Sequence, residues 1–515
     1  MLQINMLKLM HDKDFRVLID GLTFAVNPGD KIVVIGEEGE GKSTLLKWIY
    51  DPKLIEEYAA SEGSKSAVEE KLAYLPQELP TADRQLTVYE FMQEEPLFAE
   101  MNPAEIARVT KEVGLDQEML YSDQIMNTLS GGEKVKVQIA RLLASRPSIL
   151  LLDEPSNDID IETLEWLESF INKSKMGVLF VSHDETLIEN TANRVIHIEQ
   201  LYHKTMPRHT VANMPYRQYV KERLHGFELQ EAQANMEKRT QRIAEEKWRR
   251  IYQRVEHEQN VITRGDPSTG RLLKKKMHAV KSQGRRLEKQ KENMTDLPHF
   301  EQEINLMFDY EVQIPRGKML LMLRIPELSV ELADGRKVLS RDIQLEIRGS
   351  EKVCIIGKNG AGKTTLLKRI REELLKRTDI SFAYMPQNYE DLLDPEKTPE
   401  EFIARNGSKD ERVIINNRLA SLRFTPDDMN RRIGELSGGQ KAKLILLSLT
   451  LSGADILLLD EPTRNFSPLS GPVIRRILRD FSGAIISVSH DRKYIYEVPD
   501  RVLKLTQEGL SLLIY

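Results

Sequence analysis

The stretch Gly36-Glu-Glu-Gly-Glu-Gly41-Lys42-Ser43-Thr44 decides the fold class of this chain. A second version, Gly357-Lys-Asn-Gly-Ala-Gly362-Lys363-Thr364-Thr365, follows about 320 residues later. In such a loop the glycines let the backbone turn tightly, so that successive N–H groups point at phosphate oxygens. The loop then opens into a helix whose positive end favours an anion. Each copy therefore predicts a nucleotide-phosphate site at the start of a helix.

Four further elements follow each loop in the same order and at near-equal spacing. A glutamine comes first, then a Leu-Ser-Gly-Gly segment, then an apolar run that ends in Asp-Glu-Pro, and last a Ser-His-Asp turn. A period this long indicates duplicated domains and not a solenoid, whose repeats run roughly 20–50 residues. The elements are Gln77, 129–133, 153–155 and 182–184 in the first copy, and Gln387, 436–440, 460–462 and 489–491 in the second.

Each element suits one part of nucleotide chemistry. The loop lysine reaches the β- and γ-phosphates, and the next residue supplies a hydroxyl to magnesium. The aspartate ends an apolar run typical of a buried parallel strand, where its carboxylate can hold the magnesium shell. The glutamate after it is placed to polarise a water molecule, and the histidine of the last turn to sense the γ-phosphate. In that order the residues are Lys42, Ser43, Asp153, Glu154 and His183, and Lys363, Thr364, Asp460, Glu461 and His490.

Composition predicts a cytoplasmic protein without a membrane segment. The chain has 515 residues, enough for about three domains. Its most apolar stretch, 444–459, is interrupted by Gly453 and Asp455, and the N-terminus has no charged-then-apolar signal pattern. The one cysteine, Cys354, has no partner for an internal disulfide, which fits a reducing compartment. These features count against a membrane exporter.

The segment between the two copies is basic, although the whole chain is acidic. Residues 216–296 hold 20 Lys and Arg against 12 Asp and Glu, whereas the whole chain has a net charge of −6. Good helix formers predict two antiparallel helices, at about 216–260 and 272–293, with turn residues 264–270 between them at a tip. Trp248, Ile251 and Val255 form an apolar stripe on the first helix.

Positive charge gathers at and just after this tip. Residues 264–286 contain eight basic side chains and one acid, Asp266. A solvated helix face is one interpretation of such a run. Neutralisation of phosphates is the other, and it predicts salt-dependent binding to nucleic acid, with structured RNA favoured. No RNA-binding module signature is present, so sequence-specific recognition is not implied.

The Leu-Ser-Gly-Gly-Glu/Gln segments resemble the signature of ABC-type ATPases, and the basic helical linker between two such domains resembles the ABC-F family over essentially the whole chain. The fold this implies is α/β, with two ABC-type P-loop ATPase domains in tandem joined by a long antiparallel α-helical hairpin linker. The expected domains are 1–205, the linker 206–300 with its tip loop near 260–273, and 301–515. The resemblance implies two ATP molecules with Mg²⁺, each sandwiched between the loop of one domain and the signature of the other. Both sites then form within one chain, so we expect a monomer with no obligate protein subunit.

Carried onto this chain, the resemblance assigns both sites residue by residue. Phe15 lies 21 positions before Gly36, where the family places an aromatic side chain on the adenine, whereas the same count back from Gly357 reaches Arg336. Adenine contact in the second site is therefore left open. The expected catalytic residues are Glu154, Glu461, His183 and His490; the nucleotide-binding residues Phe15, Gly36, Gly39, Gly41, Lys42, Ser43, Thr44, Gln77, Ser130, Gly131, Gly132, Gly357, Gly360, Gly362, Lys363, Thr364, Thr365, Gln387, Ser437, Gly438 and Gly439; and the magnesium ligands Ser43, Gln77, Asp153, Thr364, Gln387 and Asp460.

The same resemblance implies a role on the ribosome. Members of the family bind in the tRNA exit site with ATP, and the linker reaches the P-site tRNA and the peptidyl-transferase centre, so rRNA and P-site tRNA are the expected partners. One branch dislodges ribosome-targeting antibiotics. Three features of this chain favour that branch: the long tip, the absence of an inserted arm between Gln77 and Ser130, and the variant Thr-Arg-Asn-Phe-Ser-Pro at 463–468. A housekeeping factor that relieves stalled ribosomes is the alternative, and a DNA-associated coiled-coil ATPase fits less well.

Overall fold

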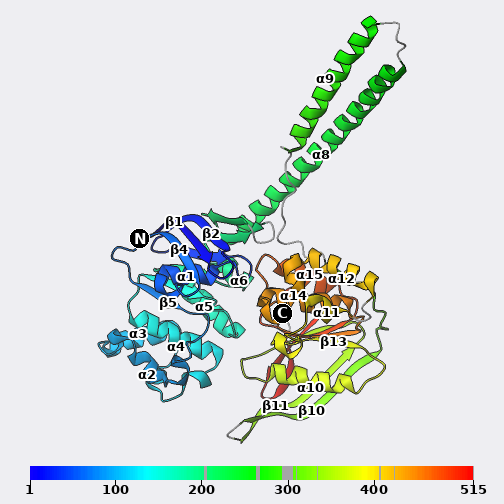
Figure 1. The fold of residues 1–515 in the computed structure, drawn as a ribbon. Helices are drawn as coiled ribbons and strands as arrows, with labels where there is room; N and C mark the ends of the chain where they lie inside the picture. Colours follow the sequence, from blue (N-terminus) through cyan, green and yellow to red (C-terminus); the bar gives the residue numbers. More distant parts are fainter. Residues whose placement is uncertain are drawn as a thin grey trace. The chain divides into compact units, whose positions relative to one another are not determined.

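The computed structural model describes residues 1–201, 206–261, 267–292, 306–308, 310–332, 335–404, 408–422 and 424–513. It divides into two compact units. The larger unit joins Met1–Tyr216 to Gln302–Tyr515, and the smaller unit is Arg217–Glu301. Figure 1 shows two sheet-and-helix halves in the larger unit and two long helices in the smaller one. We call 1–216 the first half and 306–513 the second half.

The first half is built on a six-stranded sheet of order β5-β6-β7-β3-β8-β9. All neighbours are parallel except β8 and β9, which are antiparallel. A three-stranded antiparallel sheet, β2-β1-β4, accompanies it. The strands are β1 (Leu2–His11), β2 (Val17–Val26), β3 (Lys31–Ile35), β4 (Ala59–Ser66), β5 (Leu72–Leu75), β6 (Ile149–Asp153), β7 (Gly177–Val181), β8 (Arg194–Gln200) and β9 (Met206–Ala212); the helices are α1 (Lys42–Tyr50), α2 (Val88–Gln93), α3 (Pro103–Val113), α4 (Gly131–Ala144), α5 (Ile161–Lys173) and α6 (Glu185–Thr191).

The second half repeats this plan with strand order β13-β14-β15-β12-β16-β17. Only β16 and β17 are antiparallel in it, and β10 and β11 form a separate antiparallel pair. The strands are β10 (Met319–Leu332), β11 (Gly335–Arg348), β12 (Lys352–Ile356), β13 (Phe382–Met385), β14 (Ile456–Asp460), β15 (Ala484–Val488), β16 (Arg501–Thr506) and β17 (Gly509–Leu513); the helices are α10 (Lys363–Leu375), α11 (Pro399–Ile403), α12 (Lys409–Ser421), α13 (Pro426–Asn430), α14 (Gly438–Leu451), α15 (Gly471–Asp480) and α16 (Arg492–Glu497).

The predicted α/β fold with two tandem domains is confirmed, and so are the buried strands before each Asp-Glu-Pro. Every residue of β6 and of β14 is buried, as expected for parallel strands covered on both faces. Leu151 and Leu179 of the first sheet pack with Leu45 and Ile49 of α1 in one apolar cluster. This core fixes the carboxyl ends of β3, β6 and β7, from which the phosphate loop, the Asp-Glu pair and the Ser-His-Asp turn extend.

In the smaller unit, α8 (Tyr216–Val261) and α9 (Pro267–Glu292) run antiparallel, as predicted. Trp248 Nε1 donates to the carbonyl of Val280 at 2.8 Å, and Gln241 Nε2 donates to that of Leu287 at 2.9 Å. The buried cluster between the helices consists of Val255, Leu273, Met277 and Val280, with Trp248 and Tyr252 packed against it.

Two expectations for this unit need correction. Ile251 is 46% exposed, and Tyr252 takes its place in the apolar stripe because the fourth residue after Trp248 returns to the same helix face. The helix α9 begins at Pro267, within the expected turn, because proline lacks only an N–H that the first helical position does not use. Residues 262–266 of the tip, with Arg264 and Asp266, lie outside the described residues.

None of the helices in the described ranges combines the length and the apolar character that crossing a lipid bilayer requires.

Candidate functional site

Both phosphate loops adopt one conformation. Each helix starts after a glycine with φ of 95°, Gly41 before α1 and Gly362 before α10, a left-handed conformation that side chains resist. Lys42 Nζ donates to the carbonyls of Gly36 at 2.9 Å and Glu37 at 2.8 Å. The ammonium is thus folded over its own loop, where a phosphate would lie.

The second loop repeats this arrangement. Lys363 Nζ donates to the carbonyls of Gly357 at 2.8 Å and Lys358 at 3.1 Å. Lys42 and Lys363 are both buried, each with 8% of its surface exposed. Two loops with different middle residues therefore present the same lysine geometry.

Hard oxygen ligands stand beside each lysine. Ser43 Oγ donates to Asp153 Oδ1 at 2.9 Å, and Tyr74 donates to Oδ2 at 3.1 Å. Burial raises the pKa of Asp153 to about 6. In the second half, both buried carboxylate oxygens of Asp460 lack a hydrogen-bond partner among the described residues, and burial raises the pKa of this carboxyl group as well. Hydroxyl and carboxylate oxygens are the ligands that Mg²⁺ prefers, so these residues fit that ion.

The Glu-His pairs of the two halves differ in geometry. His183 Nε2 lies 3.0 Å from Glu154 Oε1, whereas His490 Nε2 lies 3.7 Å from Glu461 Oε1. Burial alone would raise the pKa of Glu154, but the nearby charges of His183 and Lys42 bring it below its usual value. Burial raises the pKa of Glu461 to about 8, and it lowers the pKa of His490 to about 3.

Both glutamates occupy a strained backbone conformation that the sequence did not reveal. Glu154 has φ of 50° and Glu461 has φ of 53°. Four residues later, Asp158 has φ of 55° and Asn465 has φ of 64°. Such conformations cost free energy in residues other than glycine, and they cluster at functional sites. Their recurrence at equivalent positions indicates that the fold imposes the same two strained turns in both halves.

The signature segments each begin a helix with a capping box. Ser130 caps α4 by accepting from the N–H of Glu133 at 3.3 Å, while the Glu133 carboxylate accepts from the N–H of Ser130 at 2.9 Å. Ser437 and Gln440 make the same reciprocal pair at α14. The fifth signature residue, Glu133 or Gln440, was not predicted to have a role, although a Ser followed three residues later by Glu or Gln is a known sign of a helix start.

The two halves meet with each phosphate loop beside the opposite signature. The N–H of Gly439 donates to the carboxylate of Glu38, and Lys443 Nζ lies 2.9 Å from both oxygens of Glu37. At the other junction, a cavity of about 720 Å³ lies between Ser130 and Gly132 on one side and the residues Lys358 and Asn359 on the other.

A cavity of about 530 Å³ adjoins the second phosphate loop. Residues of both halves line it, so neither half encloses it alone. The candidate residues along it are Gly360, Gly362, Lys363, Thr364, Thr365, Gln387, Asp460, Glu461 and His490 from the second half and His183 from the first.

Four of the residues considered for the two nucleotide sites are exposed. Phe15 is 75% exposed, although its neighbour Arg16 donates to the carbonyl of Gly39 at 3.2 Å. Gln77 and Gln387 are exposed just after β5 and β13, and only Gln387 lines the 530 Å³ cavity described above. Arg336 is held by Glu327 at 2.9 Å and does not line that cavity. Lys337, the next residue, lines it together with Val330 and Leu339.

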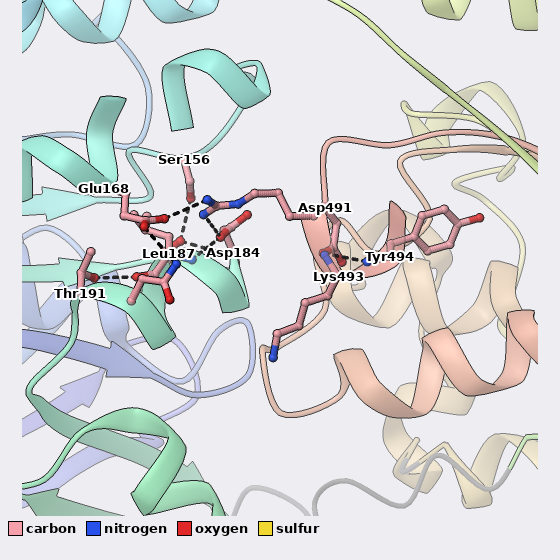
Figure 2. Close-up of polar contacts among 11 residues, drawn as sticks. Ser156, Glu168, Asp184, Leu187, Thr191, Asp491, Lys493 and Tyr494 are labelled. Carbon is pink, nitrogen blue, oxygen red and sulfur yellow. Dashed lines mark hydrogen bonds and ion pairs between the residues drawn. The ribbon is translucent and has the colours of Figure 1, made fainter. Parts of the chain in front are cut away.

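A charged cluster joins the two Ser-His-Asp turns. Arg492, the residue after the second turn, donates to Glu168 at 2.8 Å and to Asp184 of the first turn at 3.2 Å. Lys493 pairs with Glu185 at 2.7 Å and Glu189 at 2.6 Å. Figure 2 shows Glu168 and Asp184 facing the segment that carries Asp491 and Lys493. The first half supplies the acids of this cluster and the second half the bases.

Comparisons with known proteins show the family to which the two halves belong. The family model described as "ABC transporter" matches residues 19–157 and 340–464. The chain is 27% identical over 504 residues to the ATP-binding protein Uup of Buchnera aphidicola subsp. Acyrthosiphon pisum (strain APS), covering 93% of this chain and 76% of that protein. It is 24% identical to the ABC transporter F family member 5 of Arabidopsis thaliana, covering 96% of this chain and 73% of that protein.

The chain is also similar to a protein whose name states a role. It is 29% identical over 495 residues to the ribosome protection protein VmlR of Bacillus subtilis (strain 168), covering 95% of this chain and 84% of that protein. Among solved structures, it matches a chain in the crystal structure of archaeal ribosomal stalk protein aP1 with the archaeal ribosome recycling factor aABCE1. The TM-score is 0.60 at 19% identity, over 98% of this chain and 89% of that one. At this identity the likeness shows the fold alone.

Proposed function

Because this chain belongs to the ABC transporter family, as an ABC-F type ATPase whose two domains bind and hydrolyse ATP, we propose that it acts on the ribosome. We place it in the tRNA exit site, with its linker toward the P-site tRNA and the peptidyl-transferase centre. The similarity to a ribosome protection protein, over 95% of this chain and 84% of that protein, supports this proposal. We divide the chain into domains 1–205 and 301–515 with the linker 206–300 between them.

The observation that carries the proposal is the exposed basic face of α9. Leu273, Met277 and Val280 bury their side chains against α8, which turns the intervening residues outward. Nine basic residues of α9 are exposed, and seven of them take part in no ion pair in the described part of the chain. Unpaired like charges on one helix repel, and phosphates would neutralise them. These seven residues are Arg271, Lys274, Lys275, Lys276, Lys281, Arg285 and Arg286.

For ATP hydrolysis we assign the site residues as the geometry suggests. Lys42 and Lys363 bind phosphate oxygens, and Mg²⁺, when bound, neutralises charge on those phosphates. Glu154 keeps one buried oxygen, Oε2, without a hydrogen-bond partner in the described part of the chain, and we assign this atom to orient the attacking water. Glu461 has the same role in the second site. The ligands that we propose for Mg²⁺ are Ser43, Gln77, Asp153, Thr364, Gln387 and Asp460.

Opposite each loop, the serine and glycines of the facing signature would contact the γ-phosphate. The helix start offers N–H donors and a positive dipole end to an anion. We therefore pair the first loop with Ser437, Gly438 and Gly439, and the second loop with Ser130, Gly131 and Gly132. We assign His183 and His490 to sense the γ-phosphate.

At the finer level, we propose that the protein dislodges antibiotics that bind near the peptidyl-transferase centre. The relative named for ribosome protection supports this, and so does the variant segment 463–468. In the structure, Arg464 of that segment pairs with Asp158 of the first half at 3.0 Å, so the variant lies at the junction of the two ATPase domains. A housekeeping role on stalled ribosomes is the rival function, because the chain is also similar to proteins named only for ATP binding.

Drug susceptibility separates the two functions. A sensitive host that expresses the wild-type chain is compared with hosts expressing Lys42→Ala or a variant whose tip residues 262–266 are replaced by a Gly-Ser loop. We expect the wild type to raise the inhibitory concentration of at least one peptidyl-transferase inhibitor, and both variants to lose this effect. If the wild type protects against no such inhibitor, while it still co-purifies with ribosomes in an ATP-dependent manner, the housekeeping function is correct.

A further inference from the structure

The first phosphate loop carries acidic side chains where the second carries none. Glu37, Glu38 and Glu40 stand at the positions that Lys358, Asn359 and Ala361 occupy in the second loop. A loop that binds phosphates gains from positive or neutral residues, because like charges repel at short range. The acidic side chains therefore need another explanation than contact with ATP.

Two of these carboxylates reach across the domain junction to the second signature helix. Glu38 accepts a hydrogen bond from the N–H of Gly439, the second residue of α14. A Cβ atom added at Gly438 would lie 3.1 Å from the same carboxylate. The Glu38 carboxylate therefore occupies space that is open because the signature residues are glycines. Glu37 lies 2.9 Å, through both of its oxygens, from Lys443 Nζ on the next turn of this helix.

The opposite junction is built differently. Lys358 pairs with Glu162 at 3.2 Å, and Asn359 donates to the carbonyl of Asp158 at 2.5 Å. Neither contact involves the Ser130 N-cap or an N–H group of the first signature helix. Cavities of about 530 and 720 Å³ lie there, whereas the space around Glu37, Glu38 and the second signature measures only about 20 Å³.

We propose that Glu37 and Glu38 form an internal anion that occupies the second signature in place of a γ-phosphate, so that the first site takes ATP less readily than the second. Glu38 uses the N–H donor that the phosphate would use, and Glu37 neutralises Lys443 beside it. ATP must displace both carboxylates to close the first site, while the second site needs no such displacement. This inference rests on the proposed role of the signature residues. It predicts that ATP fills the second site before the first.

Exchange of the loop residues tests this with a control inside the same chain. In a Lys363→Ala background, which disables the second site, binding of trinitrophenyl-ATP with Mg²⁺ reports the first site. We expect Glu37→Lys with Glu38→Asn to tighten its Kd at least about tenfold, because the exchange removes two carboxylates that compete with the phosphate and repel it. The reverse exchange, Lys358→Glu with Asn359→Glu in a Lys42→Ala background, should weaken the second site by a similar factor.

Amide hydrogen exchange gives a second readout that does not depend on nucleotide. Without ATP, the amide of Gly439 should exchange slowly in the wild type and at least about tenfold faster in Glu38→Ala, because a lost hydrogen bond of about 1.4 kcal/mol corresponds to that factor. Glu38→Gln keeps the size of the side chain, and it should tighten the Kd of the first site if the double exchange fails to fold.

The outcomes separate the inference from the function it rests on. An unchanged Kd in folded Glu37→Lys/Glu38→Asn and Glu38→Gln proteins, together with unchanged exchange at Gly439, would overturn the internal anion alone. Binding to the Lys363→Ala protein that persists after Lys42→Ala is added would overturn the assignment of the first loop, and the inference with it.

Discussion

The ring of His183 bridges its own glutamate and the other half of the molecule: Nε2 lies 3.0 Å from Glu154 Oε1, and Nδ1 lies 2.7 Å from the carbonyl of Phe466. The equivalent His490 is less constrained. Its Nε2 lies 3.7 Å from Glu461, and its Nδ1 has no hydrogen-bond partner in the described part of the chain. The first site therefore has its Glu-His pair aligned in advance, whereas the second must move to align.

This difference predicts unequal hydrolysis by the two sites. At saturating ATP, Glu154→Gln should lower steady-state ATPase activity more than Glu461→Gln, because a positioned base contributes about 10²–10⁴-fold to rate. The measurement is kcat for each single variant, with ATP binding checked separately. Equal losses of kcat in the two variants would show that the alignment of the Glu-His pair does not affect the rate of hydrolysis.

The double variant should behave as a trap. Glu154→Gln with Glu461→Gln removes both carboxylates and keeps the phosphate contacts, so ATP should stay bound and uncleaved. We expect the protein to remain on ribosomes during sedimentation and to inhibit growth when it is expressed. Lys42→Ala is the contrast, since it weakens ATP binding and should not trap. ATP turnover at the wild-type rate by the double variant would remove both glutamates from catalysis.

The basic face of α9 predicts a salt dependence. Changing Lys274, Lys275 and Lys276 to Gln should lower affinity for ribosomes and flatten the slope of log K against log salt by up to about 0.7–0.9 per lost contact. Basal ATPase activity should stay the same. A matched control changes three exposed lysines of the first half, Lys111, Lys173 and Lys175, to Gln. If both triple variants give the wild-type slope, the run on α9 is only a solvated face.

The helix pair offers two glycines with opposite expectations. A Cβ atom at Gly284 would lie 2.9 Å from the Trp248 ring, so Gly284→Ala should destabilise the pair by about 1–3 kcal/mol. Gly270 has nothing within 4 Å of such an atom, so Gly270→Ala should stabilise α9 by up to about 1 kcal/mol. Hydrogen exchange of α8 and α9 in the full chain measures both changes, and a protection loss in Gly270→Ala equal to that in Gly284→Ala would contradict the packing.

Glu40 predicts a pH dependence of stability. Burial, reinforced by the charge of Glu37, raises the pKa of Glu40 to about 7, from the usual 4.5. A raised pKa means that the folded state holds a proton that the unfolded state releases. The stabilisation is therefore complete below about pH 4.5 and is lost as the pH rises through about 7, at about 1.4 kcal/mol per pH unit.

Glu40→Gln cannot lose this proton, so its melting temperature relative to wild type should rise between pH 5 and about pH 7 and then level off toward pH 8. The matched control is Glu78→Gln, whose carboxylate is 80% exposed in an ion pair with Arg84. A difference between wild type and Glu40→Gln that stays constant over this range would show that Glu40 is ionised throughout.

The fold class and the duplication could be predicted from the order and spacing of motifs along the chain. The phosphate loops and the Asp-Glu-Pro segments are motifs of neighbouring residues, so they could be recognised without coordinates. The two long helices were also readable, because helix propensity and an apolar stripe act over neighbouring residues. Ile251 and the start of α9 were missed, since packing against a second helix decides which residues face inward and where the turn ends.

The differences between the two sites come from contacts that form only in the folded protein. His183 and His490 share the same Ser-His-Asp motif, yet their distances to Glu154 and Glu461 differ. The carbonyl of Phe466 in the other half hydrogen-bonds to the His183 ring, whereas Nδ1 of His490 has no hydrogen-bond partner among the described residues. The acidic residues Glu37 and Glu38 are plain in the sequence, but their partners Gly439 and Lys443 lie about 400 positions away. Hydrogen bonds and ion pairs act over a few ångströms, so a partner this distant along the chain is known only once the fold brings it near.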